Sequence, residues 1–295
     1  MKRFTSSGAE IAYQVQGQGS PLLLLHGFPQ TRAMWDKIAP KLAARFTVVT
    51  ADLRGYGASS KPEGLEAYSF RAMGRDMLEL MAHLGHERFG LVGHDRGART
   101  AHRMALDAPQ RITKLALLDI IPTHHLLQAL SKEVAKGYYH WFFLAQPAPF
   151  PETLIRHDPD HYFQSCLTGW GSTALQDFAP DQLAAYRKSW RDPATITAMC
   201  NDYRAALDID FAMDAADLGR QLDIPTLILY GADGPMAKAY DVPGTWADRV
   251  SPLTSQSMTG GHFFPDTAPT ETSNALMAFF FPNYPRNKAY AEPCC

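Results

Sequence analysis

Short apolar runs alternate with helical patterns along most of the chain. Continuous apolar runs between polar or glycine-rich segments are typical of strands that are buried on both faces of a parallel sheet. The pattern predicts a first hairpin at residues 10–15, strands at 21–25, 47–53, 89–92 and 112–120, and helices at 33–44, 69–84 and from 98 onward. Strands that alternate with helices imply a mostly parallel sheet, which binds ligands beyond the carboxyl ends of its strands.

This alternation stops after Pro122. Residues 123–216 are rich in aromatic side chains and helical patterns, contain several prolines and show no strand pattern. The α/β pattern then returns with a strand at 225–231, a helix near 236–249, a short strand near 253–258 and a helix around 271–280. We therefore predict an α/β core in two parts, 1–121 and 217–282, a helical cap at 122–216 inserted between them, and a flexible tail at 283–295.

Composition and charge exclude several classes of function. The 295 residues are 46% hydrophobic, which is enough for a sizeable core, and the net charge of −2 favours neither nucleic acid nor an acidic membrane surface as a partner. No apolar run is long enough to span a bilayer, and the first residues lack the apolar core of a signal peptide. Four cysteines without paired spacing predict free thiols in a reducing, cytoplasmic compartment, with no disulfide framework and no zinc site.

A sharp turn between the strand at 89–92 and the next helix carries the first candidate for chemistry. Gly93-His94-Asp95-Arg96-Gly97 has the G-x-nucleophile-x-G form, in which the central residue is held strained and exposed to the site. Asp95 stands where such turns usually carry Ser. A carboxylate is ionised near pH 7 and suits attack on an sp3 carbon, which gives an alkyl ester that water must then hydrolyse. The site therefore needs a base and an oxyanion hole.

The candidate base is His262, which follows Gly260-Gly261 just past the last predicted strand. The chain order nucleophile, acid, histidine is that of the α/β-hydrolase fold. Two carboxylates could orient the histidine: Asp119 at the end of the 112–120 strand, and Asp233 after the 225–231 strand. Spacing alone does not choose between them, since both lie on loops at the same edge of the sheet.

Further residues could complete the site. The backbone N–H groups of Phe28 and Arg96 are suitably located for an oxyanion hole, and the side chains of Arg96 and Arg99 could hold a carboxylate from the first turn of the helix. The cap offers N–H and O–H donors within Tyr138-Tyr139-His140-Trp141-Phe142-Phe143 and Asn201-Asp202-Tyr203-Arg204. Taken singly, such aromatic residues are more often part of a core.

With these residues assembled, the sequence resembles the fluoroacetate (haloacetate) dehalogenases of the α/β-hydrolase superfamily. The resemblance covers nearly the whole chain before the tail. It is carried by L-H-G-F-P-Q, A-D-L-R-G-Y-G, G-H-D-R-G-A-R-T, L-D-I-I-P-T, H-W-F-F-L-A-Q-P-A-P, D-Y-R-A and G-G-H-F-F. H-G-x-P and G-x-D-x-G are shared with epoxide hydrolases and haloalkane dehalogenases, whereas the arginine pair and the His-Trp pair are far more specific.

The resemblance implies a complete site and mechanism. Arg96 and Arg99 would grip the carboxylate of a small anionic haloacid, and Asp95 would displace the halide. The halide would be bound by His140, Trp141 and Tyr203. His262, oriented by Asp119, would activate water to release glycolate, and no metal or organic cofactor would take part. Members of this family are commonly homodimers, so a homodimer is expected here as well.

Two other functions fit parts of this pattern. An epoxide hydrolase would use the same Asp95 and His262, with Tyr203 and either Tyr138 or Tyr139 protonating the ring oxygen. A simple epoxide has no carboxylate, however, and gives the paired arginines no role. A non-catalytic binding protein on the same scaffold would have lost a member of the triad, and all the required members are present.

Overall fold

An eight-stranded, mostly parallel sheet forms the centre of the molecule in the computed structural model, which describes residues 1–128, 130–169 and 173–281. The strand order is β1-β2-β4-β3-β5-β6-β7-β8. β2 runs antiparallel to both of its neighbours, and the strands from β4 to β8 pair in parallel. The strands are β1 (Lys2–Thr5), β2 (Glu10–Gln16), β3 (Ser20–Leu25), β4 (Phe46–Ala51), β5 (Phe89–His94), β6 (Ile112–Leu118), β7 (Leu222–Gly231) and β8 (Val250–Met258).

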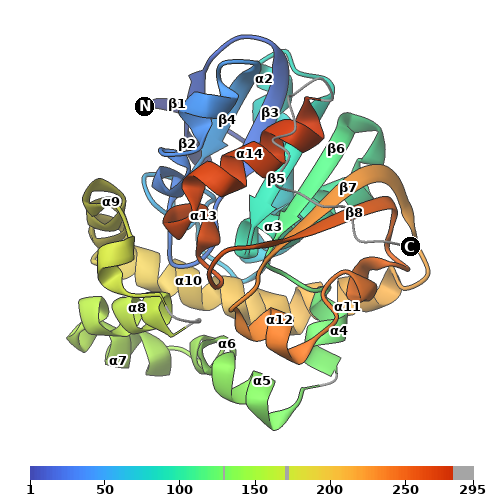
Figure 1. Cartoon of the computed structure of the whole chain (residues 1–295). Coiled ribbons are helices and arrows are strands. Elements are labelled where there is room, and N and C mark those ends of the chain that lie inside the picture. Colours follow the sequence, from blue (N-terminus) through green and yellow to red (C-terminus); the bar gives the residue numbers. More distant parts are fainter. Residues whose placement is uncertain (129, 170–172, 282–295) are drawn as a thin grey trace.

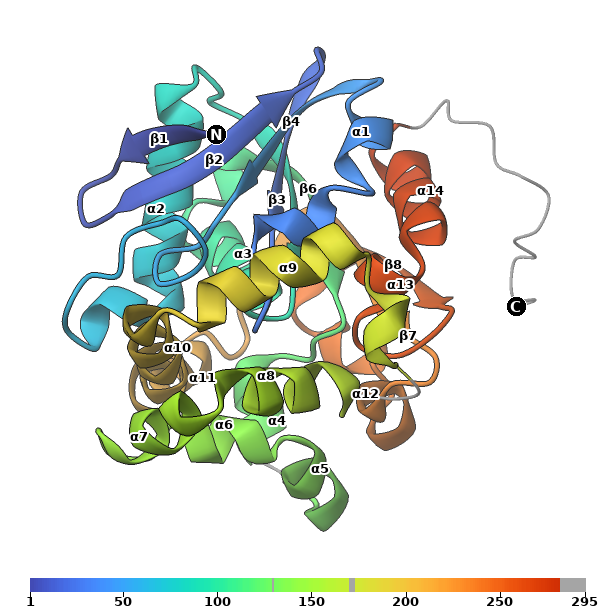
Figure 2. The ribbon, with the colours of Figure 1, turned by 90° about the vertical axis from the view of Figure 1, so that its left-hand side faces the viewer.

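Helices cover both faces of this sheet. α2 and α3 lie on one face and α14 lies on the other, with the strands between them in both views (Figures 1 and 2). The core helices are α1 (Ala39–Leu42), α2 (Phe70–His83), α3 (Arg96–Asp107), α12 (Pro235–Ala239), α13 (Phe264–Thr267) and α14 (Pro269–Phe280). Short 3-10 turns stand at Arg32–Trp35, Glu66–Tyr68, Pro109–Arg111 and Gly244–Trp246.

The described residues between 122 and 216 form helices and turns and contain no strand. Figure 1 shows α5 to α8 gathered on one side of the sheet. These helices are α4 (Thr123–Gln128), α5 (Lys132–Gly137), α6 (Tyr139–Leu144), α7 (Phe150–His157), α8 (Pro159–Thr168), α9 (Pro180–Trp190), α10 (Pro193–Ala205) and α11 (Phe211–Ala216), with a 3-10 turn at Leu175–Asp177 and a π-helical turn at Ala206–Asp210. We use the word cap for this helical segment.

The apolar pattern explains how the core elements form and pack. The four leucines of β3, residues 22–25, have no exposed surface because the strand pairs with β4 on one side and β5 on the other. In α2, buried side chains recur at Met73, Met77, Leu80 and Met81, which lie on one face of a helix. The hydroxyl of Ser69 caps the start of α2 by accepting from the N–H of Ala72 at 3.3 Å.

Two predicted helices are wrong in extent. The helix predicted at 33–44 is a 3-10 turn at Arg32–Trp35 and a separate short α1, because Pro40 cannot donate the backbone hydrogen bond that a continuous helix would need there. The helix predicted near 236–249 is α12 followed by the 3-10 turn at Gly244–Trp246, and Pro243 interrupts it in the same way. The tail predicted at 283–295 lies outside the described residues.

Candidate active site

Asp95 lies in a strained turn between β5 and α3. Its φ angle is +48°, a region that residues other than glycine rarely occupy. A β-carbon on Gly93 would lie 2.3 Å from the carbonyl oxygen of Gly97, and one on Gly97 would lie 2.4 Å from the carbonyl oxygen of His26. Both glycines are therefore needed for the close packing that fixes the position of Asp95.

The carboxylate of Asp95 is buried and strongly acidic. Burial raises its pKa, but the charges of His262, His94 and Arg96 and the N–H of Phe28 outweigh burial and lower the pKa to about 2. The N–H of Phe28 donates to Asp95 Oδ1 at 2.9 Å. Arg96 is the first residue of α3, so its N–H has no acceptor within the helix. Asp95 is thus ionised and has N–H donors next to it.

His262 lies beside Asp95 and is held by Asp119. His262 Nδ1 is 2.6 Å from Asp119 Oδ2, and the other oxygen of Asp119 accepts from the N–H of Gly231 at 2.8 Å. Burial lowers the pKa of His262, but the hydrogen bond and the charge of Asp119 outweigh it, so the pKa is raised above the ordinary 6.5. His262 Nε2 lies 3.8 Å from Asp95 Oδ2, which is too long for a hydrogen bond. The imidazole therefore faces the carboxylate without binding it directly.

The structure shows which of the two candidate carboxylates contacts His262. Asp119 follows β6, has no exposed surface and has a φ of +52°, which turns its side chain to His262. Asp233 follows β7 and is exposed to solvent, and its own N–H donates to the carbonyl of Gly260. Asp119, and not Asp233, is in contact with the imidazole.

The two arginines of α3 are both buried but are held differently. Arg96 donates through Nε to Asp202 Oδ2 at 3.0 Å and through Nη2 to both Asp202 Oδ1 and the Asp202 carbonyl. Arg99 donates through Nη1 to the carbonyl of Ile121 at 3.1 Å and to the hydroxyl of Thr123 at 3.0 Å. No described carboxylate forms an ion pair with Arg99, and burial lowers its pKa. The positive charge of Arg99 is thus the less compensated of the two.

The three predicted halide-binding residues lie together in the cap, on α6 and α10. The ring of Tyr203, on α10, lies 5.4 Å from the ring of Trp141 and 5.5 Å from that of His140, which are on α6. Phe28 stacks on His140 at 5.8 Å and meets Tyr203 edge-on at 5.0 Å. Burial lowers the pKa of His140 to about 3, so its imidazole is neutral.

Buried donors without a partner gather around Arg96 and Arg99, on the helix that follows Asp95. Among the described residues, no hydrogen-bond partner reaches Arg96 Nη1, Arg99 Nε, Trp141 Nε1 or the hydroxyl of Tyr203. The two guanidiniums lie over the ring of Trp141 at 5.1 and 4.9 Å, so the four donors belong to one cluster. An unsatisfied buried polar group costs about 1–3 kcal/mol, so such a cluster indicates a site for an anion.

Sequence reasoning missed two residues that the structure adds to the site. Asp202 binds Arg96 and also accepts from the hydroxyl of Tyr56 at 2.6 Å. Tyr56 lies within the A-D-L-R-G-Y-G motif, and Asp202 immediately precedes Tyr203. An acid next to a candidate site residue was the available signal, but its partner Arg96 is 106 residues away. Of the two adjacent tyrosines, Tyr138 is 4% exposed and Tyr139 is 47% exposed, so only Tyr138 faces the interior.

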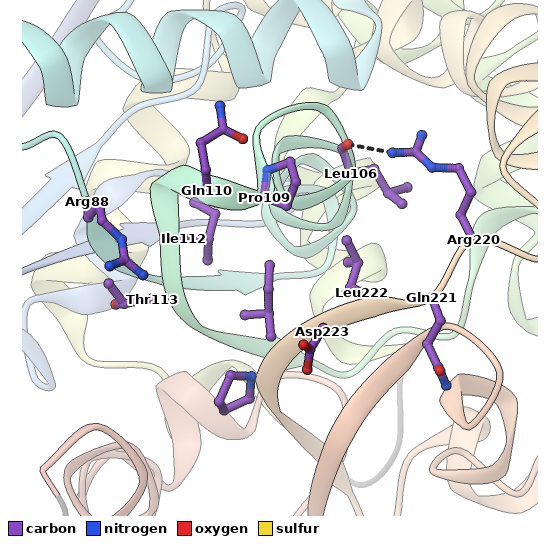
Figure 3. A pocket seen from close by; sticks show the side chains of 12 residues that line it. Arg88, Leu106, Pro109, Gln110, Ile112, Thr113, Arg220, Gln221, Leu222 and Asp223 are labelled. Atoms are coloured by element: carbon purple, nitrogen blue, oxygen red, sulfur yellow. Dashed lines mark hydrogen bonds between the residues drawn. The ribbon is translucent and has the colours of Figure 1, made fainter.

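A separate cavity of about 490 Å³ lies away from this chemistry (Figure 3). Its lining includes Ile112 and Leu222, which begin β6 and β7, whereas Asp95 and Asp119 follow the ends of β5 and β6. Arg220 on its rim donates to the carbonyl of Leu106 at 2.9 Å. This cavity is therefore at the opposite edge of the sheet from Asp95.

Within the described ranges, no group of three or more His, Cys, Asp or Glu side chains could hold a metal ion, and no helix is long and apolar enough to cross a membrane.

Comparisons with known proteins agree with this architecture. Residues 20–269 match the family described as having the alpha/beta hydrolase fold. The chain is 53% identical to a fluoroacetate dehalogenase of Burkholderia sp over 90% of this chain and 88% of that protein. It is 31% identical to a soluble epoxide hydrolase of Corynebacterium sp. (strain C12) over 94% of this chain and 95% of that protein. The crystal structure of the alpha/beta hydrolase ALR0039 from Nostoc sp PCC 7120 superposes with a TM-score of 0.93 and 48% identity, covering 95% of this chain and 97% of that one.

Proposed function

The chain belongs to the α/β-hydrolase fold family, and from this premise we propose that it is a haloacetate dehalogenase that converts fluoroacetate into glycolate and fluoride. The observation that carries the proposal is the cluster of unpartnered donors next to Asp95. Two of these donors are on arginines, which suit a carboxylate, and two are on the Trp141–Tyr203 pair, which suits a halide. The much higher identity to a fluoroacetate dehalogenase than to an epoxide hydrolase supports the same conclusion.

The first step places the substrate carboxylate on the free donors of Arg99 and Arg96. Asp95 Oδ2 then attacks the α-carbon while the halide leaves on the opposite side of that carbon. Fluoride is small and strongly hydrated, so its departure into a dry pocket requires hydrogen-bond donors. The indole N–H of Trp141, the hydroxyl of Tyr203 and the neutral imidazole of His140 supply them, and the α-carbon remains as an ester on Asp95.

The second step hydrolyses this ester. His262 Nε2 takes a proton from water, which attacks the carboxyl carbon of Asp95, and Asp119 stabilises the imidazolium that forms. The N–H of Phe28 already donates to Asp95 Oδ1, the oxygen that becomes the oxyanion, and the N–H of Arg96 is the second donor. These residues perform the reaction without a metal or an organic cofactor.

We propose that residues 122–216 form the cap and that residues 1–121 and 217–282 form the two parts of the core. We also propose that the enzyme works in the cytoplasm as a homodimer. The described cysteines, Cys166 and Cys200, are buried and unpaired, as expected in a reducing compartment. Light scattering on the purified protein tests the dimer.

Halide release from fluoroacetate and chloroacetate, followed with an ion electrode, tests the main proposal. Diol formation from a neutral epoxide is measured in parallel. We expect halide release from both acids and little turnover of the neutral epoxide. Turnover of the epoxide alone would instead identify an epoxide hydrolase.

A further inference from the structure

We propose that the same site hydrolyses a second class of substrate, small epoxides that carry a carboxylate on the ring, of which oxiranecarboxylate (glycidate) is the smallest. This inference rests on the proposed function, because it uses the same nucleophile, base and carboxylate site. It extends that function because halide departure leaves one chemical capacity of the site unused.

The unused capacity is the proton of the Tyr203 hydroxyl. This phenol is fully buried and has no hydrogen-bond partner among the described residues. The ring of Tyr203 lies 5.0 Å from that of Phe28, whose N–H donates to Asp95. The guanidinium of Arg96 lies over the Tyr203 ring at 4.4 Å, so the phenol is beside the nucleophile turn. Burial is the largest cause that raises the pKa of Tyr203, and the negative charge of Asp95 is the next. A departing halide needs a hydrogen bond but no proton. An alkoxide needs both, and it is a stronger base than tyrosinate.

The arrangement of donors also fits the shape of glycidate. In a haloacetate, the halogen and the carboxylate share one carbon. In glycidate, the ring oxygen and the carboxylate likewise share one carbon, so the ring oxygen would take the place of the halogen beside Trp141 and Tyr203. The carboxylate would keep its position on Arg99, whose charge no described carboxylate pairs with. Phe28, whose ring meets Tyr203 at 5.0 Å, is an apolar side chain next to the proposed proton donor.

The reaction balances with water as the only co-reactant. A lone pair of Asp95 Oδ2 forms a bond to the ring carbon that bears the carboxylate, and the bond from that carbon to the ring oxygen breaks. The electron pair stays on the ring oxygen, which takes the proton of Tyr203. In the second step, water gives a proton to His262, and its hydroxide adds to the carboxyl carbon of Asp95. The ester bond from that carbon to the substrate oxygen breaks, and the released alkoxide takes the proton on His262. The Asp95 carboxylic acid that remains loses its proton, which restores Tyr203 through solvent. Glycidate and water together become glycerate.

The test compares three substrates on the wild-type enzyme. Glycerate formation from glycidate is followed by mass spectrometry, the uncharged glycidamide reports the need for a carboxylate, and fluoride release from fluoroacetate reports the proposed function. We expect glycidate to be turned over faster than glycidamide by at least about an order of magnitude, because only glycidate can engage Arg99. Asp95→Asn gives the background rate of each epoxide.

A matched pair of variants tests the proton donor. Tyr203→Phe and Trp141→Phe each remove one donor to the halide, but only Tyr203 can give up a proton. Tyr203→Phe should therefore lower glycerate formation on the order of a hundredfold more than defluorination, whereas Trp141→Phe should lower both by similar factors. An unchanged ratio of the two activities in Tyr203→Phe overturns the inference. Fluoride release without glycerate formation also overturns the inference and leaves the proposed function standing. Glycerate formation without halide release supports hydrolysis of the epoxide and overturns the proposed function.

Discussion

The guanidinium of Arg96 and the carboxylate of Asp202 form a two-armed ion pair in which neither side chain has any exposed surface. Arg96 begins α3 of the core and Asp202 lies on α10 of the cap. The pair therefore joins the cap to the nucleophile turn, and it leaves Arg96 a single free arm, Nη1, for a ligand. We infer that Asp202 is a positioning residue for Arg96.

Removal of the Asp202 charge should destabilise the protein. Asp202→Asn leaves the buried guanidinium of Arg96 without a counter-charge, and breaking a buried ion pair costs on the order of 3 kcal/mol. The free energy of unfolding, measured by chemical denaturation, should fall by about this amount. The matched control is Asp208→Asn, at an exposed position in the π-helical turn that follows α10, and it should change the free energy of unfolding little. Equal stability of the two variants would contradict a structural role for the ion pair.

Replacement of His262 should separate the two steps of the reaction. His262→Ala keeps the nucleophile ionised but removes the base that activates water, so the ester on Asp95 should accumulate. Mass spectrometry of the folded variant after exposure to chloroacetate should show the protein heavier by one carboxymethyl group, located on the peptide that contains Asp95. The same treatment of Asp95→Asn is the control. A modified residue other than Asp95 would refute covalent catalysis by this carboxylate.

The two carboxylates near the base should differ in their contribution to turnover. Asp119→Asn removes the charge that orients His262 and stabilises its imidazolium, so kcat should fall on the order of a thousandfold or more. Asp233→Asn changes an exposed carboxylate on the neighbouring loop and should leave kcat nearly unchanged. Steady-state kinetics with fluoroacetate measure both variants. A larger loss in Asp233→Asn would move the acid to the loop after β7.

Part of this site follows from the sequence alone, and part depends on tertiary contacts. Asp95 and His262 are recognisable because each lies in a short local motif, a tight glycine turn and a glycine loop after a strand. The sequence does not decide between Asp119 and Asp233, because that choice depends on which loop turns its side chain inward. The burial of Tyr138 and the exposure of Tyr139 depend on where α6 begins.

The fold shows the same division. The parallel strands are predictable because short continuous apolar runs between polar or glycine-rich segments are typical of buried strands. The ends of the two helices predicted at 33–44 and 236–249 are not predictable, because a proline inside a helical pattern can either kink a helix or end it. The Arg96–Asp202 pair joins residues that are far apart in the chain, and no local pattern reports such a contact.

Arg99 should account for most of the preference for a charged substrate. Arg96 already binds Asp202, whereas Arg99 binds only a carbonyl and a hydroxyl. Arg99→Met should lower kcat/KM for fluoroacetate by about 2–4 kcal/mol in transition-state free energy, a loss of tens- to several-hundredfold. Arg99→Lys should recover only part of the activity, because an ammonium keeps the charge without the planar fork.

The uncharged fluoroacetamide separates carboxylate binding from general damage. Wild type and the exposed control Arg75→Met should strongly prefer fluoroacetate, and Arg99→Met should lose most of this preference while circular dichroism shows a folded protein. An unchanged preference in Arg99→Met would mean that the carboxylate binds elsewhere.

The two steps should also respond differently to pH. The base must be neutral to accept a proton, and Asp119 raises the pKa of His262 above 6.5, although burial opposes this. Ester hydrolysis should therefore slow as the pH falls through the pKa of His262. Burial raises the pKa of Asp95, but the neighbouring positive charges hold it at about 2, so the nucleophile stays ionised over the same range. Alkylation should consequently persist where hydrolysis fails.

Rapid-quench experiments at several pH values measure both steps. In weak acid we expect a burst of fluoride equivalent to one ester per site, followed by slow turnover, and at higher pH we expect the slow phase to speed up while the burst rate stays constant. In Asp119→Asn, the residual activity should extend to lower pH, because the carboxylate that raises the pKa of His262 is gone. A burst rate that falls together with turnover would place a protonation below pH 7 on the nucleophile itself, and it would contradict the separation of roles between Asp95 and His262.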